Sequence, residues 1–339
     1  MRSARPTPAA PDPGDGDLEE VRCNCCGADD AETVYEARAP ERAREDSVRV
    51  FRASGDELLL DRLVRCRRCG LEYVSPRLRS ALIVDAYSAG EDPQYVSQIQ
   101  ARERTFSSAL ARIERLAGHR GRLLDVGTAA GAFLAAARAR GWHVDGCEPN
   151  RWMAAWGSQY YGLQIRGGEI FDQDLPLRSF DVITLWDVIE HTPDPSRVIE
   201  HITRLLKPGG LLVVNYPDRG SWLARALGRR WPFLSSGHLY YFNRRTMTRL
   251  LNMHGLSVID IRPHVQHLEL DDLLMRGSAV SASLSRVLRP VARATGLSRR
   301  RVPCWLGQTF VAARLGAIVP VDERRVEGSP RPAGVGLAH

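Results

Sequence analysis

Two cysteine pairs near the start of the chain have the spacing of a metal site. The segments Cys23-x-x-Cys26-Gly27 and Cys66-x-x-Cys69-Gly70 are separated by 39 residues. A C-x-x-C turn brings two thiolates to one tetrahedral ion, and two such turns complete a closed four-cysteine zinc site. Such a set has no open position, so the expected Zn²⁺ is structural. Cys25 is an alternative ligand in the first pair, and reduced thiols without a metal are the alternative for the whole set.

A glycine-containing turn and a later acid form a second group of chemically suggestive residues. The run Arg122–Gly131 (RLLDVGTAAG) is a strand-like segment that ends at Asp125 and continues through a turn of small residues. Small residues let the backbone approach a ligand closely, and the following helix presents free N–H groups. Glu148 ends the next apolar segment, where an acid can accept hydrogen bonds from ribose hydroxyls. The pair predicts a nucleotide-like ligand; the alternative is a tight turn with a surface glutamate.

The elements that would position these residues alternate from Gly121 onward. Apolar runs occur at 122–126, 143–147, 180–186 and 211–216, with helix-like segments such as 131–140 and 196–206 between them. Two later strands are expected near 256–262 and 308–314, and a helix is expected over 98–117. This alternation is typical of a parallel sheet covered by helices, so the predicted fold class is α/β.

Composition divides the chain into four parts. We expect a disordered tail at 1–20, a cysteine-bearing domain at 21–80, an α/β domain at 81–321 and a second tail at 322–339. An arginine-rich helical insertion is expected at 264–306, because Leu273 to Val321 holds eight arginines and no acidic residue. Pro290 is expected to bend or interrupt its helix. The insertion also carries an apolar stripe, formed by Val280, Leu284, Val287, Leu288 and Val291.

Several segments together resemble class I S-adenosylmethionine (SAM)-dependent methyltransferases. The turn 125–131 resembles their motif I, usually [D/E]-x-G-x-G-x-G, with Ala129 where the middle glycine usually stands. Three later runs resemble family motifs in the same order, namely FDVITLWDVIEH at 180–191, LLKPGGLLVV at 205–214 and HLYYFNRRT at 238–246. The resemblance covers 95–316 and implies a Rossmann-like sheet of seven strands. The run LEYVSP at 71–76 resembles zinc-ribbon methyltransferases, which include C-methyltransferases of deoxysugars, so 21–80 is expected to be zinc-ribbon-like.

The resemblance implies roles for individual residues around SAM. Asp125, Gly127 and Gly131 would line its methionine end, and Glu148 would hold the ribose. The remaining assignments are Glu169 at the adenine amino group, Asp187 facing the methyl donor, and Arg104 on the SAM carboxylate. A solvated helix face is the alternative for Arg104.

Oxygen and carbon acceptors often need a base near the methyl group. His191 and His238 are the candidates, because imidazole titrates near neutral pH; helix capping or packing is the alternative for both. Asp187, Glu190 and His191 would also share one helical face, which permits a divalent cation. Some quinone-type O-methyltransferases with a similar acid-x-x-Glu-His segment use one.

The expected function is therefore SAM-dependent methyl transfer to an oxygen or carbon of a small molecule, such as a sugar, a sugar nucleotide or a lipid-linked intermediate. The sequence LWDV at 185–188 lacks the Asn- or Asp-Pro-Pro-Tyr motif common in amino-nitrogen methyltransferases. One alternative is an RNA or protein methyltransferase that uses the zinc module for recognition. The other is a non-catalytic SAM-fold binding protein, which only Ala129 favours.

Overall charge and hydropathy limit the partners. The 47 basic and 40 acidic residues give a net charge of +7, too mild to indicate nucleic acid. No apolar run approaches the roughly 20 residues that span a bilayer, and the first residues lack the apolar segment of a signal peptide, so we expect a cytoplasmic protein. The arginine-rich insertion suits a phosphate-bearing or membrane-surface partner, with a solvated helical cap as the alternative.

Overall fold

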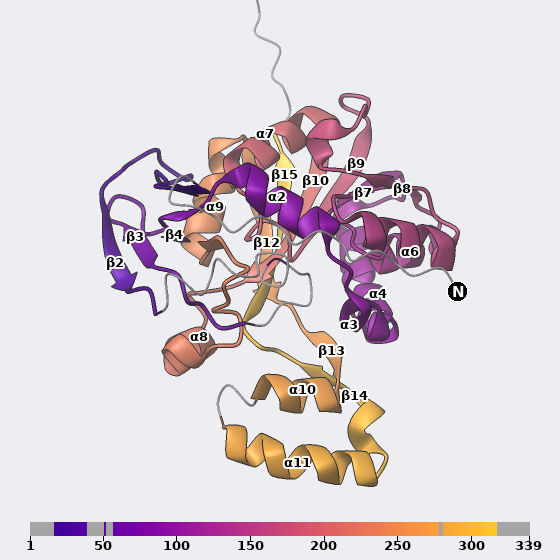
Figure 1. Ribbon diagram of the computed structural model, residues 1–339. Helices are drawn as coiled ribbons and strands as arrows, with labels where there is room; N and C mark the ends of the chain where they lie inside the picture. Colours follow the sequence, from indigo (N-terminus) through magenta and orange to yellow (C-terminus); the bar gives the residue numbers. More distant parts are fainter. Residues whose placement is uncertain (1–16, 39–50, 52–56, 278–280, 317–339) are drawn as a thin grey trace, which may run out of the picture.

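A seven-stranded sheet forms the centre of the protein (Figure 1). The computed structural model describes residues 17–38, 51, 57–277 and 281–316. The strands lie in the order β12-β15-β10-β9-β6-β7-β8, and β15 runs antiparallel to both of its neighbours while the others are parallel. Their bounds are β6 Arg122–Val126, β7 His143–Glu148, β8 Ile165–Gly167, β9 Phe180–Trp186, β10 Leu206–Pro217, β12 Leu256–Pro263 and β15 Gln308–Leu315. The predicted α/β fold class and the seven-stranded sheet are confirmed.

Helices cover both faces of this sheet because neighbouring strand residues point to opposite sides. Leu123 and Val182 pack with α4 (Ile99–Ala117) and α5 (Ala132–Ala139). Leu124 and Ile183 pack in the opposite layer with α7 (Pro195–Leu205) and α9 (Arg244–Met253). The fully apolar strands that the sequence showed are therefore buried on two faces. The other α-helices that the structure describes before the insertion are α2 (Ser80–Ala89), α3 (Pro93–Ser97), α6 (Arg151–Tyr161) and α8 (Trp222–Leu227).

The cysteine-bearing segment forms a second sheet, which also includes one strand of the large domain. Its strands are β2 (Ala31–Tyr35), β3 (Leu63–Cys66), β4 (Glu72–Val74) and β11 (Tyr240–Tyr241), in the order β11-β4-β3-β2. Buried cysteines and Tyr73 of this segment belong to the same hydrophobic cluster as strands β6, β9 and β10. We call residues 21–80 the cysteine module; it shares a core with the α/β domain.

The N-terminal prediction needs one correction. Leu18–Glu19 form strand β1, which pairs antiparallel with β5 (Arg77–Leu78), although we expected all of 1–20 to be a disordered tail. The partner strand lies about sixty residues away in the sequence, so no local sequence pattern indicates that the two strands pair. The expected tail at 322–339 lies outside the described residues.

The insertion stands apart from the sheet at the bottom of Figure 1. Its stalk is the antiparallel pair β13 (Gln266–Glu269) and β14 (Arg301–Cys304), which carries helices α10 (Leu270–Gly277) and α11 (Ala282–Ala294). Of the two expectations for Pro290, a bend or an interruption, the second is wrong, because Pro290 lies inside α11 and the helix continues past it. Among the described residues, no helix has both the length and the apolar character to cross a membrane.

Candidate active site

A large cavity opens at the carboxyl ends of strands β6, β9 and β10. In open α/β sheets this edge is where ligands bind. The space between its walls amounts to about 1960 Å³ when the open solvent at its mouth is counted. Its walls come from the turn after β6, the segments after β7, β8 and β9, helices α2 and α4, the insertion, and the loop that precedes β11.

The turn after β6 forms a close-fitting wall of this cavity. Gly127 has φ 66°, and a Cβ atom there would lie 2.7 Å from Cγ2 of Val188, so only glycine fits without movement. Ala129 also has a positive φ of 49°, the conformation that the usual glycine would adopt without strain. Gly131 has φ 78° and starts α5, behind the cavity wall. Asp125 is buried and accepts a hydrogen bond from Thr184 Oγ1 at 2.5 Å; burial raises its pKa to about 7.

Glu148 lies beneath the turn rather than at the open surface of the cavity. Its Oε2 accepts from the backbone N–H of Ala129 at 2.7 Å, and its Oε1 accepts from the N–H of Asn150 at 2.8 Å. Complete burial raises the pKa of Glu148 to about 7. Asn150 Nδ2 in turn donates to the carbonyl oxygens of Tyr87 and Gly90, which ties α2 and its end to this corner. Glu169 lines the cavity directly, and burial raises its pKa.

Asp187 lies between the turn and the histidines. It has φ 53°, and its Oδ1 accepts from Asn215 Nδ2 and from Gln308 Nε2, each at 2.7 Å. Burial raises its pKa to about 6, against the opposing charge of Arg102. Asn215 and Gln308 lie on β10 and β15, far from Asp187 in the sequence, so sequence reasoning missed both.

Arg104 does not line the cavity, contrary to our expectation. It is exposed on α4, and the guanidinium that reaches the cavity belongs to Arg102. Residues two apart on a helix lie about 200° apart around the axis, so both cannot face one ligand. Arg102 stacks over the ring of Tyr95 at 3.8 Å, and its buried Nε has no hydrogen-bond partner among the described residues. The buried side chains Ala101 and Thr105 mark the inner face of α4 and could have indicated Arg102.

Both predicted histidines line the cavity and contact each other. The ring centroids of His191 and His238 are 4.6 Å apart in an edge-to-face arrangement. His191 Nδ1 lies 2.8 Å from the carbonyl oxygen of Gly237, and His238 Nδ1 lies 2.8 Å from that of Phe233. A carbonyl only accepts, so Nδ1 carries the proton in each ring and Nε2 carries the lone pair. Burial lowers the pKa of His191 to about 4 and that of His238 well below its usual value.

Glu190 completes this group, which we call the His–His–Glu cluster. Both carboxylate oxygens of Glu190 are buried without a hydrogen-bond partner in the described structure, and burial raises its pKa, with Asp187 adding to the shift. One ligand atom from each of Glu190, His191 and His238 lies within 4.8 Å of the others. Glu190, His191 and His238 could therefore bind a divalent cation together. The set of ligands expected from the sequence contained Asp187 in place of His238.

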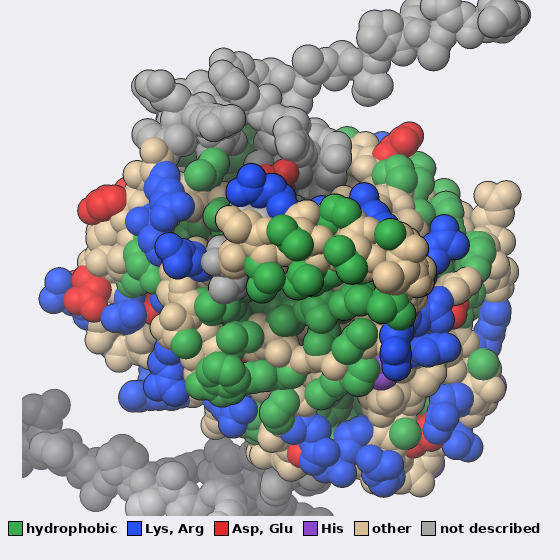
Figure 2. All heavy atoms as spheres, turned by 90° about the horizontal axis from the view of Figure 1, so that it is seen from below, with side chains coloured by type: hydrophobic (Ala, Val, Ile, Leu, Met, Phe, Trp, Pro, Cys, Tyr) green, Lys and Arg blue, Asp and Glu red, His purple; other side chains and the backbone are tan. Residues whose placement is uncertain are grey.

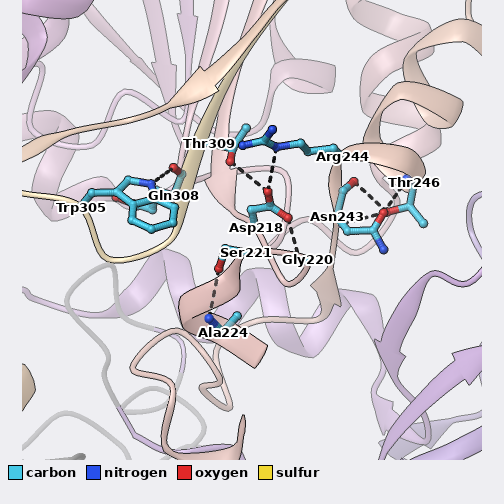
Figure 3. A network of polar contacts seen from close by, with 10 residues as sticks. All are labelled: Asp218, Gly220, Ser221, Ala224, Asn243, Arg244, Thr246, Trp305, Gln308 and Thr309. Carbon is cyan, nitrogen blue, oxygen red and sulfur yellow. Dashed lines mark hydrogen bonds and ion pairs between the residues drawn. The ribbon is translucent and has the colours of Figure 1, made fainter. Parts of the chain in front are cut away.

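A buried carboxylate, Asp218, joins the segment after β10 to β15 and to α9 (Figure 3). Asp218 follows β10 and accepts from the N–H of Gly220 at 2.8 Å, from Thr309 Oγ1 at 3.2 Å and from Arg244 Nε at 3.3 Å. These bonds join the segment to β15 and to the first turn of α9. The segment between Asp218 and α9, which contains α8, β11 and His238, is thus joined to the rest of the domain at its start and at its end.

The four predicted cysteines meet at one point of the cysteine module. Cys23 Sγ lies 3.4 Å from Cys69 Sγ, Cys26 Sγ lies 3.5 Å from Cys66 Sγ, and all four sulfurs lie within 4.8 Å of one another. A tetrahedron with zinc–sulfur bonds near 2.3 Å has sulfurs about 3.8 Å apart, so this separation suits a metal and is too long for a disulfide. Cys25 Sγ lies outside this group; it contacts the carbonyl oxygen of Thr246 at 3.9 Å and also the thiol of Cys69.

Comparison with known proteins agrees with this geometry. Residues 99–261 match the family profile described as a methyltransferase domain. A protein of Mycolicibacterium smegmatis, named as a probable S-adenosylmethionine-dependent methyltransferase, is 31% identical over 133 residues, which are 39% of this chain and 50% of that protein. Residues 99–261 therefore form a methyltransferase domain. The motifs from the turn after β6 to α9 all lie within its matched range.

The methyltransferase domain has other relatives at similar distance. A ubiquinone biosynthesis O-methyltransferase of Coxiella burnetii is 32% identical over 105 residues, covering 29% of this chain and 44% of that enzyme. The chain therefore spans about half the length of the curated relatives it matches. A solved SAM-dependent methyltransferase from Archaeoglobus fulgidus has 18% identity and a TM-score of 0.44, over 66% of this chain and all of that one.

Proposed function

We propose that the protein transfers a methyl group from SAM to an oxygen or carbon atom of a small molecule. The observation that carries this proposal is one cavity whose wall contains two chemically different groups of residues. The first group is the close-fitting turn after β6, with buried acids beside it. The second group is the His–His–Glu cluster, whose imidazoles are neutral and present unpaired nitrogen lone pairs.

The residues of the first group fit the cofactor. SAM supplies an activated methyl group when it is bound, so the protein's task is to position and desolvate the reactants. Gly127 would let the backbone approach the methionine end beside Asp125, Gly131 would allow the tight turn behind the wall, and Glu148 would hold the ribose. Glu169 would contact the adenine amino group, and Asp187 would face the methyl donor. Arg102, whose buried Nε has no partner among the described residues, replaces Arg104 as our candidate for the carboxylate.

The His–His–Glu cluster would accept the proton that an acceptor hydroxyl or acidic carbon loses. Burial keeps both imidazoles neutral near neutral pH, so the lone pair of each Nε2 is free to accept a proton, and the lowered pKa makes each ring a weaker base than free imidazole. Glu190 lies beside them; burial raises its pKa, and an imidazolium next to it would lower that pKa again, so the two opposite charges would stabilise each other. The name of the Coxiella burnetii relative supports an oxygen acceptor. A sugar, a sugar nucleotide or a lipid-linked intermediate stays our proposal for the acceptor, and Arg102 and Arg276 in the cavity wall suit a phosphate group.

We also propose that Cys23, Cys26, Cys66 and Cys69 hold a structural Zn²⁺. The support is the spacing of their sulfurs and the burial of three of the four side chains. Because the four thiolates complete a tetrahedron, this ion would stabilise the fold and take no part in methyl transfer. Reduced thiols are typical of the cytoplasm, which we propose as the compartment.

Replacing Glu148 by alanine is expected to weaken SAM binding about 10- to 100-fold. The substitution removes the charged ribose acceptor and leaves the N–H groups of Ala129 and Asn150 without their partner. Isothermal titration of folded protein with SAM measures the effect. Glu148→Gln keeps one acceptor oxygen and should lose less affinity. If the alanine variant binds SAM as the wild type does, Glu148 does not hold the ribose.

Arg102 and Arg104 offer a matched pair on one helix. Arg102→Ala is expected to lower SAM affinity about tenfold or more, because a charge-assisted bond to the carboxylate is lost. Arg104→Ala removes the same charge from the exposed face and should leave affinity unchanged. Titration of both variants with SAM compares them directly. The opposite ranking would restore Arg104 as the carboxylate ligand.

A further inference from the structure

Helix α11 exposes the side that an ordinary helix buries. Its aliphatic residues at spacing i, i+3, i+4 and i+7 form a stripe, yet Leu284, Val287 and Val291 are 58%, 63% and 54% exposed. The side chains buried against the rest of the protein are the small ones, Ser285 and Ala292. We call Leu284, Val287, Leu288 and Val291 the outer stripe. Figure 2 looks at the molecule from the side of the insertion and shows hydrophobic side chains gathered across this face.

The orientation of this helix is fixed by specific contacts. Asp271 of α10 pairs with Arg289 and Arg293 of α11, at 3.1 and 2.9 Å. Ser285 Oγ donates to the carbonyl oxygen of Leu274 at 2.8 Å on the same side. The outer stripe therefore cannot turn inward without breaking these bonds.

The charged residues of the insertion are mostly positive. Residues 264–306 contain seven arginines and three acidic residues, a formal charge of +4. Two of the three acids, Asp271 and Asp272, are already paired with arginines of the insertion itself. Helix α11 carries no acidic residue, and its arginines lie off the outer stripe. Figure 2 shows Lys and Arg side chains around the hydrophobic area.

We propose that this face docks on an anionic lipid surface, with α11 lying in the plane of the interface. A helix with an apolar stripe binds such surfaces by burying the stripe among the acyl chains, while exposed basic residues of the insertion, such as Arg299 and Arg300, meet the headgroups. The 13 residues of α11 span about 20 Å, enough to lie along a membrane and too short to cross it. A second copy of this chain fits the face less well, because it would bring another insertion of charge +4 against the first.

The insertion is also a wall of the cavity. Gln266, His267 and Leu268 of the stalk and Arg276 of α10 line it, so docking would hold the cavity close to the lipid headgroups. This consequence rests on the proposed function, and it favours an acceptor that carries both a phosphate-bearing head and an apolar tail.

Vesicle flotation of the full chain tests the docking and needs no activity. We expect the protein to float with phosphatidylcholine vesicles that contain phosphatidylglycerol, and much less with phosphatidylcholine alone. The variant L284S/V287S/V291S should bind the anionic vesicles about tenfold or more weakly. Leu177→Ser removes an equally exposed aliphatic side chain elsewhere and should bind as the wild type does. Raised salt should weaken binding, because headgroup attraction is screened.

Three outcomes would overturn the proposal. The wild type could fail to float with anionic vesicles, or the triple variant could float as well as the wild type. Alternatively, light scattering could show a dimer that the triple variant abolishes while vesicles bind neither protein, which would assign the outer stripe to a second copy. SAM titration of the same samples reports separately on the proposed function, so a failure of one is distinguishable from a failure of the other.

Discussion

Replacing Cys66 by serine is expected to remove most of the zinc and to lower the free energy of unfolding by several kcal/mol. Serine is a poor zinc ligand, and the energy of metal binding at a closed thiolate site is folding energy. Cys66 ends β3, whose sheet contains β11 of the large domain, and the module shares its hydrophobic core with the central sheet. The loss should therefore lower the melting temperature of the whole chain. Elemental analysis and thermal unfolding measure the two effects.

Cys25 supplies the matched control for this experiment. It is a buried neighbour in the same module that contacts Thr246 and Cys69, but its sulfur does not belong to the group of four that meet within 4.8 Å. Cys25→Ser should retain one zinc ion per chain. A full complement of zinc in Cys66→Ser, or its loss in Cys25→Ser, would reject the ligand set that we propose.

Replacing His238 by alanine is expected to slow methyl transfer about 10²- to 10⁴-fold while SAM affinity stays the same. The range is that of losing a positioned general base. Because burial lowers the pKa of His191 to about 4 and of His238 well below its usual value, both rings stay neutral at pH 6. Wild-type activity should therefore persist at pH 6, where an ordinary histidine is largely protonated. Formation of S-adenosylhomocysteine, with an acceptor found by screening hydroxylated small molecules, measures the rate.

Two controls make this result interpretable. His254→Ala removes a histidine that lies outside the cavity, beside Ser196, and should leave the rate unchanged. Treatment of the wild type with EDTA tests the cation alternative at the His–His–Glu cluster. Activity that is lost with EDTA and restored by Mg²⁺ would make the cluster a metal site, and an unchanged rate in His238→Ala would exclude His238 as the base.

Site residues that directly follow a strand could be predicted from the sequence. Asp125 and Glu148 could be placed because the period of a buried strand and the turn after it are local properties, and parallel strands end at one edge. The cysteine pairs were equally readable, because a C-x-x-C turn brings two sulfurs together whatever surrounds it. These features depend on a few neighbouring residues.

Features that depend on how distant elements meet could not be predicted. Arg104 was chosen instead of Arg102 because the rotation of α4 about its axis is set by packing on the sheet. Gln308 reaches Asp187 across 121 positions of sequence. The two residues of β11 are too few to show a strand period, so the shared sheet of the cysteine module left no local signal.

Strand β11 has a consequence for how such proteins can be recombined. Tyr240 and Tyr241 pair with β4 of the cysteine module, and His238 lies two positions before them in the same segment. An exchange of the first eighty residues with those of a relative would thus separate β11 from its native partner strand β4, close to His238. In a functional chimaera, the segment around His238 must therefore be exchanged together with the cysteine module. The two stretches are distant in the sequence, but they have to be inherited together.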